Sequence, residues 1–341
     1  MTRTLVMTGA AALVLGLGTG ALVARQAAQR YVVGNPVGLP VEPAADGRFA
    51  PASVNVKVYG AVYSAESCSY DPVRKLIVVP NRGVPQHIQA NNAWISLLNH
   101  DGSVHTPRWI GVQNPGPARD GSTPPLVLNE PFGSDIVNGT LYVADRDGST
   151  GPDVKGVAVI RRFDMATGMP KGETPVPAVE WFNDIEVAGD GTVYATVTGG
   201  GQETDAATWQ VWRIRPDGTS SAIITGAPLK RPNGIAIDGD GNLVVVNMLT
   251  PDVQTFTPDG RLLETEQAAQ PGNDGIVIMK DGTKYVSSVT QGGVSRIRPG
   301  QAATLIAENI PSAASMCYDE GANQLVIPMN ANNALAFVKL D

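Results

Sequence analysis

The chain contains 341 residues, of which 43% are hydrophobic and 17% charged; this suffices for a full core and exceeds the length of one ordinary domain. Its 38 glycines and 26 prolines are too few to indicate disorder and agree with many tight turns. The net charge of −7 argues against a nucleic-acid partner, because neutralising phosphates requires a basic surface.

The N-terminal residues 1–24 resemble a targeting segment. Arg3 precedes an apolar run from Leu5 to Ala24 that is interrupted only by small residues. The pattern predicts an export signal peptide or an uncleaved membrane anchor, and both stay open, because a small-residue cleavage site is present but the run is longer than a usual signal core. We expect a monomer that is exported to the periplasm or secreted. Residues 25–52, rich in proline, glycine and alanine, are predicted to form a linker.

Residues 53–341 are predicted to form one all-β domain made of repeats. The clearest repeat, at 231–247, has a polar start, a short apolar strand, an Asp/Gly turn and a second apolar strand. The equivalent positions Asn183, Asn233 and Asp274 are separated by 50 and 41 residues, and a strand-rich repeat of roughly 40 to 50 residues is typical of propeller blades. Six first strands are predicted, near 65–71, 131–135, 182–187, 232–238, 273–278 and 313–319.

The two ends of this domain are predicted to meet. The last repeat lacks a fourth strand, which an alternating apolar segment at about 53–59 would supply, giving a six-bladed β-propeller without exposed edges at the junction. A seventh blade would need another first strand between 71 and 131, but segments 94–98 and 109–112 serve better as outer strands of the first blade. Cys68 and Cys317 fall on the inner strands of the first and last blades. They form either a disulfide or two small buried hydrophobic residues, and the sequence leaves this open because their registers differ by one residue.

One side chain at the start of each first strand should point into the central channel. In four repeats this side chain bears oxygen, and the four residues are Glu66, Asn183, Asn233 and Asp274. Oxygen ligands that include two carboxylates suit a hard divalent cation. Any one of these residues alone is better explained as turn chemistry, because Asn-Gly and Asp-Gly are common turn dipeptides. Each repeat already has a hairpin turn further on, however, so we predict a metal site, with small residues at Gly133 and Ala314 leaving positions open for water or substrate.

These motifs resemble those of the senescence marker protein/gluconolactonase family, the regucalcin-like lactonases, which are six-bladed propellers. The resemblance covers about residues 60–341 and rests on four motifs in order, Glu66-Ser67, Asn183-Asp184, Pro232-Asn233-Gly234 and Asp274-Gly275. It implies that the four residues named above hold one divalent ion, most often calcium, with zinc, manganese or magnesium as alternatives. It also implies that Asp274 acts as base or nucleophile.

The chain departs from this family at Trp181. Sugar lactonases that it resembles usually carry an arginine there, and an indole offers an apolar face and one donor in place of a guanidinium fork. We therefore expect a more apolar lactone or ester than a typical sugar lactone, unless Trp181 simply packs in the wall. Glu203 on a glycine-rich loop and His87 on another long loop are further candidates for substrate binding, with a solvated loop carboxylate as the alternative for Glu203.

The sequence thus predicts a metal-dependent hydrolase of a small-molecule lactone or ester. The ion would polarise the carbonyl, and Asp274 would position or deprotonate water or attack directly. No Gly-x-Ser-x-Gly motif supports a serine triad. The main alternative is a non-catalytic exported propeller that binds a protein or ligand at its loop rim and holds a structural calcium. A strictosidine-synthase-like enzyme is a third, weaker alternative, because that branch lacks the four ligands.

Overall fold

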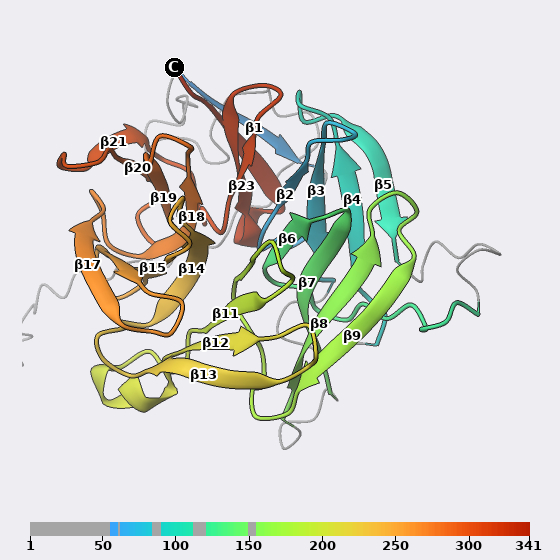
Figure 1. The fold of residues 1–341 in the computed structure, drawn as a ribbon. Helices are drawn as coiled ribbons and strands as arrows, with labels where there is room; N and C mark the ends of the chain where they lie inside the picture. Colours follow the sequence, from blue (N-terminus) through green and yellow to red (C-terminus); the bar gives the residue numbers. More distant parts are fainter. Residues whose placement is uncertain (1–54, 61, 84–89, 112–120, 149–154) are drawn as a thin grey trace, which may run out of the picture.

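The computed structural model describes residues 55–60, 62–83, 90–111, 121–148 and 155–341. In this part of the chain, six antiparallel four-stranded sheets are arranged as blades around a central axis (Figure 1). Blade one contains β2 (Ser69–Asp71), β3 (Leu76–Asn81), β4 (Trp94–Leu98) and β5 (Val104–Ile110), and blade two contains β6 (Ser134–Val137), β7 (Thr140–Asp147), β8 (Val157–Asp164) and β9 (Pro170–Val176).

The next two blades repeat this order of strands. Blade three contains β10 (Ile185–Val187), β11 (Val193–Val197), β12 (Gln210–Ile214) and β13 (Ser220–Thr225). Blade four contains β14 (Pro232–Ile237), β15 (Leu243–Asn247), β16 (Asp252–Phe256) and β17 (Leu262–Gln267).

The last two blades complete the ring. Blade five contains β18 (Asn273–Ile278), β19 (Lys284–Ser288), β20 (Val294–Ile297) and β21 (Thr304–Ala307), and blade six contains β22 (Cys317–Asp319), β23 (Gln324–Met329), β24 (Ala334–Lys339) and β1 (Val56–Gly60). The second strands β3, β15 and β23 are buried along their whole length. Neighbouring blades cover both of their faces, which is why they appear in the sequence as unbroken apolar runs.

The ring closes between its first and last strands, as the sequence predicts. β1 pairs with β24 in antiparallel register, with Val56 opposite Val338, so the six-bladed propeller closed by an N-terminal strand is confirmed. The segments assigned to outer strands of the first blade are β4 and part of β5, and the seven-bladed alternative is not found.

A disulfide joins blades one and six at the same junction. Cys68 and Cys317 are bonded to each other, with their Cα atoms 5.4 Å apart and 249 residues between them in the sequence. Of the two alternatives left open by the sequence, the disulfide is therefore the correct one. The side chains of His100 and Asp319 add a second contact across this junction, with Nδ1 2.7 Å from Oδ1.

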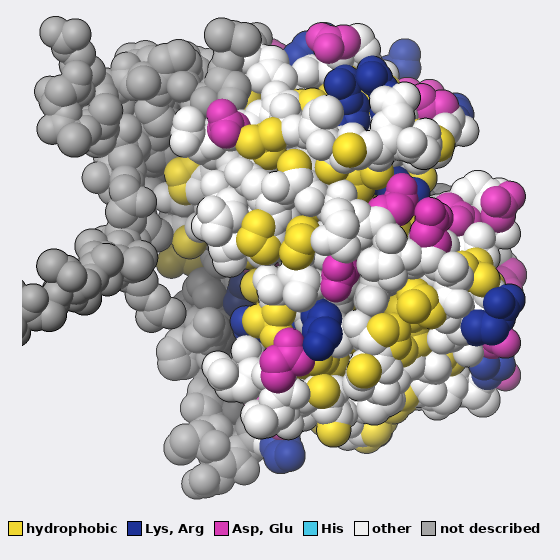
Figure 2. All heavy atoms as spheres, turned by 90° about the vertical axis from the view of Figure 1, so that its left-hand side faces the viewer, with side chains coloured by type: hydrophobic (Ala, Val, Ile, Leu, Met, Phe, Trp, Pro, Cys, Tyr) yellow, Lys and Arg dark blue, Asp and Glu magenta, His cyan; other side chains and the backbone are white. Residues whose placement is uncertain are grey.

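In the described residues no helix is long and apolar enough to cross a membrane. The helical elements there are the short 3₁₀ turns η1 (Glu203–Thr208) and η2 (Asn330–Asn332). The predicted targeting segment at 1–24 and the linker at 25–52 lie outside the described residues. On the side of the propeller shown in Figure 2, lysine and arginine side chains are interspersed with aspartate and glutamate, and hydrophobic side chains are scattered among them.

Candidate functional site

The four predicted ligand residues occupy equivalent places in the fold. Glu66 lies just before β2, Asn183 lies just before β10, and Asn233 and Asp274 lie near the starts of β14 and β18. All four are buried, with exposed fractions of 7%, 6%, 1% and 2% in that order. A buried polar side chain needs a partner to offset its lost hydration, so the contacts of these four residues show what they are arranged to do.

Backbone irregularities set the orientation of two of them. The pairing of β14 with β15 shifts register between Pro232 and Ile235, and that of β18 with β19 shifts between Asn273 and Ile276. Asn233 and Asp274 lie within these irregular segments. Such bulges redirect a side chain away from the regular alternation of a strand and are frequent beside active sites.

Asn233 and Asp274 are bonded to each other. Asn233 Nδ2 donates to Asp274 Oδ2 at 3.0 Å, and Asn183 Nδ2 donates to Thr198 Oγ1 at 2.8 Å. In all three residues the remaining oxygen, Oδ1, is buried and has no hydrogen-bond partner among the described residues. Leaving a buried acceptor unpaired costs about 1–3 kcal/mol, so three such oxygens on three consecutive blades require an explanation.

An oxygen-preferring cation is one explanation that fits this donor set. The set consists of two carboxylates and two amides, the oxygen ligands that hard divalent cations prefer. In the described part of the chain no three histidine, cysteine, aspartate or glutamate side chains form a cluster that could hold a metal ion. Any metal at this position would therefore depend on the two asparagines as well as on Glu66 and Asp274.

Hydroxyl side chains on the second strands hold the backbone of this region. Thr196 Oγ1 accepts from the Asp184 N–H at 3.2 Å and donates to the Asn233 carbonyl in the next blade. In blade five Ser287 Oγ accepts from the Gly275 N–H and donates to the Ala314 carbonyl, both at 2.8 Å. Each hydroxyl thus links one blade to the start of the next, which fixes the side chains at these starts relative to one another.

The glycines of the motifs serve close packing. A Cβ on Gly234 would lie 2.3 Å from the Asp274 carbonyl oxygen, and one on Gly275 would lie 2.6 Å from Ser315 Cα. Neither glycine has a positive φ, so the Asn-Gly and Asp-Gly pairs are not turn dipeptides here. They let neighbouring inner strands approach, and the turn explanation for Asn233 and Asp274 is wrong.

Burial and neighbouring charge perturb the carboxylates near the axis. The pKa of Asp274 is raised well above its usual value by burial and by the charges of Glu66 and Asp184, against a lowering effect of the bond from Asn233. Burial likewise raises the pKa of Asp184 to about 7, although hydrogen bonds from the Ile235 and Ile185 N–H groups and from Ser315 oppose the shift.

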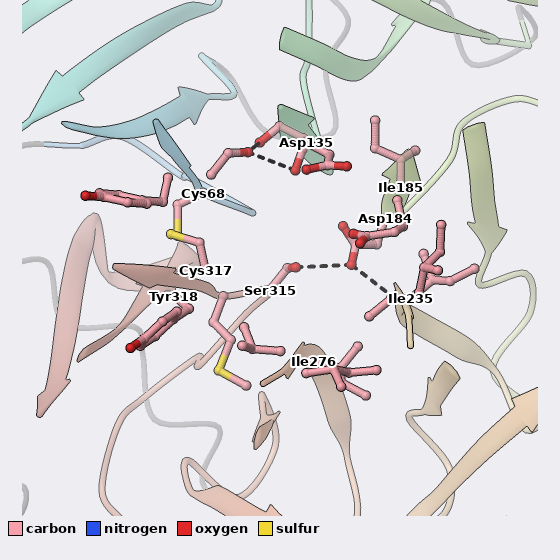
Figure 3. Close-up of a pocket in the computed structure, with 18 residues that line it drawn as sticks. Cys68, Asp135, Asp184, Ile185, Ile235, Ile276, Ser315, Cys317 and Tyr318 are labelled. Carbon is pink, nitrogen blue, oxygen red and sulfur yellow. Dashed lines mark hydrogen bonds between the residues drawn. A yellow bond between two sulfur atoms is a disulfide. The ribbon is translucent and has the colours of Figure 1, made fainter. Parts of the chain in front are cut away.

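Below these residues an axial cavity of about 220 Å³ follows the inner strands (Figure 3). Asp184 projects into it and accepts a hydrogen bond from Ser315 Oγ at 3.2 Å, which links blade three to blade six across the channel. Asp135 and the Cys68–Cys317 disulfide also line the cavity. The predicted ligands lie at or just before the starts of the inner strands. The cavity extends along these strands to residues nearer their ends, such as Tyr318 in β22.

Trp181 packs against a neighbouring blade, and its role in substrate binding stays a prediction. Its ring stacks on Phe132 with centroids 5.0 Å apart and an interplanar angle of 29°, so it packs in the wall between blades two and three. The side chain is still only half-buried. It therefore retains aromatic surface two residues from Asn183.

Of the other two predicted substrate contacts, only Glu203 lies in the described part of the chain. Glu203, in η1, is exposed and forms a salt bridge with Lys230, with Oε2 2.9 Å from Nζ. This matches the alternative of a solvated loop carboxylate. His87 lies outside the described residues.

Sequence reasoning missed a charged network beside Glu66. Arg82, which follows β3 directly, donates to Glu66 and to Glu130, and Arg146 donates to Glu130 from the next blade. The signal available in the sequence was a pair of arginines, each close to the end of the second strand of its repeat. Nothing in that pattern indicates which acids they meet.

The fold and these buried oxygens together define a six-bladed propeller with a polar site at one end of its axis. The chain belongs to the SMP-30/gluconolactonase/LRE-like family, whose model matches residues 135–328, more than half of the chain. No curated protein matches it closely enough to count as a relative.

Solved structures share the fold at low sequence identity. A gluconolactonase from Xanthomonas campestris is 17% identical with a TM-score of 0.56, over 92% of this chain and 100% of that one. A putative gluconolactonase gives the same identity and TM-score over 84% and 93% of the two chains. Virginiamycin B lyase from Staphylococcus aureus is 14% identical with a TM-score of 0.54, over 84% and 100%.

Proposed function

We propose that this protein is a metal-dependent hydrolase that opens an apolar lactone or cleaves a related ester. The observation that carries the proposal is the set of three buried oxygens on Asn183, Asn233 and Asp274 that have no hydrogen-bond partner among the described residues; the carboxylate of Glu66 lies at the equivalent place in blade one. One divalent ion, calcium in the first instance, would satisfy all of them. Membership of the SMP-30/gluconolactonase/LRE-like family supports the reaction class.

In the proposed mechanism the bound ion and Asp274 have separate roles. When bound, the ion supplies Lewis-acid polarisation of the scissile carbonyl. Asp274 takes up or positions the proton of the attacking water, since its burial and its bond from Asn233 hold one carboxylate oxygen in a fixed place. Gly133 and Ala314 present no polar side chain at the two remaining blades. A Cβ on Gly133 would lie 2.6 Å from Asp184 Cα and Ala314 is fully buried, so both small residues serve close packing and the expectation that they leave space for substrate is wrong.

The aromatic wall supports an apolar substrate. Phe132 is buried between Trp181 and Arg82, so the aromatic surface left for a ligand is that of the half-buried Trp181, which suits an acyl chain or an aromatic ring better than the hydroxyls of a sugar. Glu203 and His87 remain proposals as substrate contacts; Glu203 would have to exchange its salt bridge with Lys230 for such a contact.

We further propose that the chain is exported, to the periplasm or beyond, and works as a monomer. The Cys68–Cys317 disulfide supports an oxidising compartment, because disulfides are rare where thiols are kept reduced. Fractionation of cells that express the full chain, with the cysteines tested for thiol reactivity, checks this. Recovery of the protein in the cytoplasm with free thiols would contradict it.

The test of the function is a panel of aliphatic, aromatic and sugar lactones, assayed with and without a chelator. We expect hydrolysis of the apolar lactones, its loss on chelation and its recovery on addition of calcium or another divalent ion. Activity that is unchanged by chelation would reject the metal-based mechanism. Tight ion binding without any hydrolysis would favour the alternative of a non-catalytic propeller with a structural ion.

A further inference from the structure

Arg82 forms hydrogen bonds with the carboxylates of Glu66 and Glu130. Its side chain is only 9% exposed, and it donates from Nη1 to Glu66 Oε2 at 3.0 Å and from Nη2 to Glu130 Oε1 at 2.9 Å. Its Cζ lies 4.5 Å from the centroid of the Phe132 ring. A planar guanidinium held by two carboxylates and an aromatic face has little freedom to reorient.

A second donor addresses the same oxygen of Glu66. Asn330, at the start of η2 in blade six, donates from Nδ2 to Glu66 Oε2 at 2.7 Å. Both hydrogen bonds that the described residues supply to this carboxylate are therefore directed at Oε2 and neither at Oε1. Within the described part of the chain, one oxygen of Glu66 therefore accepts two hydrogen bonds and the other accepts none.

We propose that Arg82 is a positioning residue that restricts Glu66 to binding the ion through Oε1 alone, which keeps one coordination position open for water or substrate. The inference rests on the proposed function, because it concerns the ion of that site. Carboxylates bind calcium through one oxygen or through both, and two-oxygen binding by Glu66 would use a position that the reaction needs. Arg82 also balances part of the charge of Glu66, so that the ion is less fully neutralised and polarises a carbonyl more strongly.

The same contacts would also join blades one and two, so this structural role must be separated from the positioning role. Glu130 has a second cationic partner, Arg146, whose Nε lies 2.8 Å from Oε2. Neutralising Glu130 therefore does not require Arg82. Because Glu130 stays paired without it, we expect Arg82→Met to fold.

The experiment counts the water molecules bound to the ion. Europium(III), which prefers the same oxygen ligands, is titrated into the purified full chain, and its luminescence decay in H₂O and D₂O gives the number of coordinated waters. We expect Arg82→Met to lose about one water relative to the parent protein, because Oε2 of Glu66 then keeps only the neutral donor Asn330 and can bind the ion together with Oε1. We also expect its affinity for calcium, measured by calorimetry, to rise by about tenfold or more on removal of the nearby positive charge. Arg261→Met, at an exposed arginine, is the matched control and should change neither quantity.

Each other outcome has a defined meaning. Unchanged hydration and affinity in Arg82→Met, with a lower Tm, would show that Arg82 only joins the two blades and would overturn the inference while leaving the ion in place. Failure of the parent protein to bind an ion would remove the proposed metal chemistry and this inference with it. If Arg82→Met does not fold, the double variant Arg82→Met/Glu130→Gln replaces it, because it removes one charge of each sign. We expect the double variant to lose about one bound water as well. Unchanged hydration of the ion in the double variant would overturn the inference.

Discussion

Asn233 Nδ2 donates a hydrogen bond to Asp274 Oδ2 at 3.0 Å, which joins the starts of the inner strands of blades four and five. The bond fixes the orientation of both side chains and leaves Oδ1 of each buried and without a partner among the described residues. Both of these oxygens are thereby held in fixed orientations. The proposed ion site is built on this pair, with Asn183 and Glu66 completing it.

Asp274→Asn should retain the fold and abolish turnover. The amide has nearly the volume of the carboxylate but cannot accept a proton, and it removes one of the two negative charges at the site. We expect hydrolysis to fall by about 10³-fold or more, within the range that a general base contributes, together with weaker ion binding. Asp281→Asn, in an exposed turn, is the control. Full activity of Asp274→Asn would exclude this residue from the mechanism.

The ion-free protein should become less stable as the pH rises from about 4 to about 7. The pKa of Asp184 is raised to about 7 in the folded state, whereas an unfolded aspartate titrates near 3.9. Between these two pKa values the folded protein keeps a proton on Asp184 that the unfolded protein releases. The resulting contribution to the free energy of unfolding is lost as the pH rises towards the pKa of Asp184 in the folded state. Three pH units correspond to about 4 kcal/mol of unfolding free energy.

Urea denaturation of chelator-treated protein across this pH range measures the effect. Asp184→Asn keeps an oxygen that accepts from Ser315 and cannot titrate, so its stability should fall much less with pH than that of the parent. Equal slopes for the two proteins would show that Asp184 does not hold a proton in the folded state. The pKa of Asp274 is also raised. Because an ion and a proton compete for this carboxylate, we also expect the affinity for the ion to rise with pH.

Loss of the disulfide should weaken closure of the ring. Cys68 and Cys317 join blades separated by 249 residues of sequence, and a cross-link over so long a loop restricts the unfolded chain strongly. We expect Cys68→Ala/Cys317→Ala to lower the free energy of unfolding by about 2–5 kcal/mol. A reductant should destabilise the parent to a similar extent and leave the double variant unaffected. A reductant effect of the same size in both proteins would mean that the disulfide is not the cause.

Trp181→Arg should change which lactones are preferred. It replaces the apolar face stacked on Phe132 by a guanidinium that can bind hydroxyls. We expect kcat/KM for aromatic lactones to fall by about tenfold and that for sugar lactones to rise, since one lost apolar contact is worth about 1–3 kcal/mol. Trp181→Phe keeps an aromatic face and should keep the parent preference. An unchanged ratio in Trp181→Arg would assign Trp181 to wall packing alone.

The fold was accessible from the sequence because each blade repeats the same local pattern. Apolar second strands mark every blade, Asp/Gly turns mark blades three, four and five, and the alternating segment that forms β1 supplies the strand missing from the last blade. The positions of Asn183, Asn233 and Asp274 followed from the same repeat. Their role remained ambiguous, because an Asn-Gly pair in a turn and an Asn-Gly pair packed against a neighbouring blade look identical in sequence.

Contacts between blades could not be predicted in the same way. Arg82 and Glu130 are separated by 48 residues, and Asn330 lies 264 residues from Glu66; the repeat places these residues in their blades but does not align side chains from different blades. The disulfide illustrates the same point. Cys68 and Cys317 differ by one position in register, yet β2 and β22 belong to different sheets, so the register within a sheet does not decide whether they meet.

The most direct test of the account is an anomalous difference map from crystals grown with manganese or calcium. We predict one peak, within bonding distance of oxygens from Glu66, Asn183, Asn233 and Asp274, with Glu66 contributing Oε1 only. An ion bound elsewhere, or crystals without a peak at this position under saturating metal, would contradict the central claim that these four side chains hold a catalytic cation.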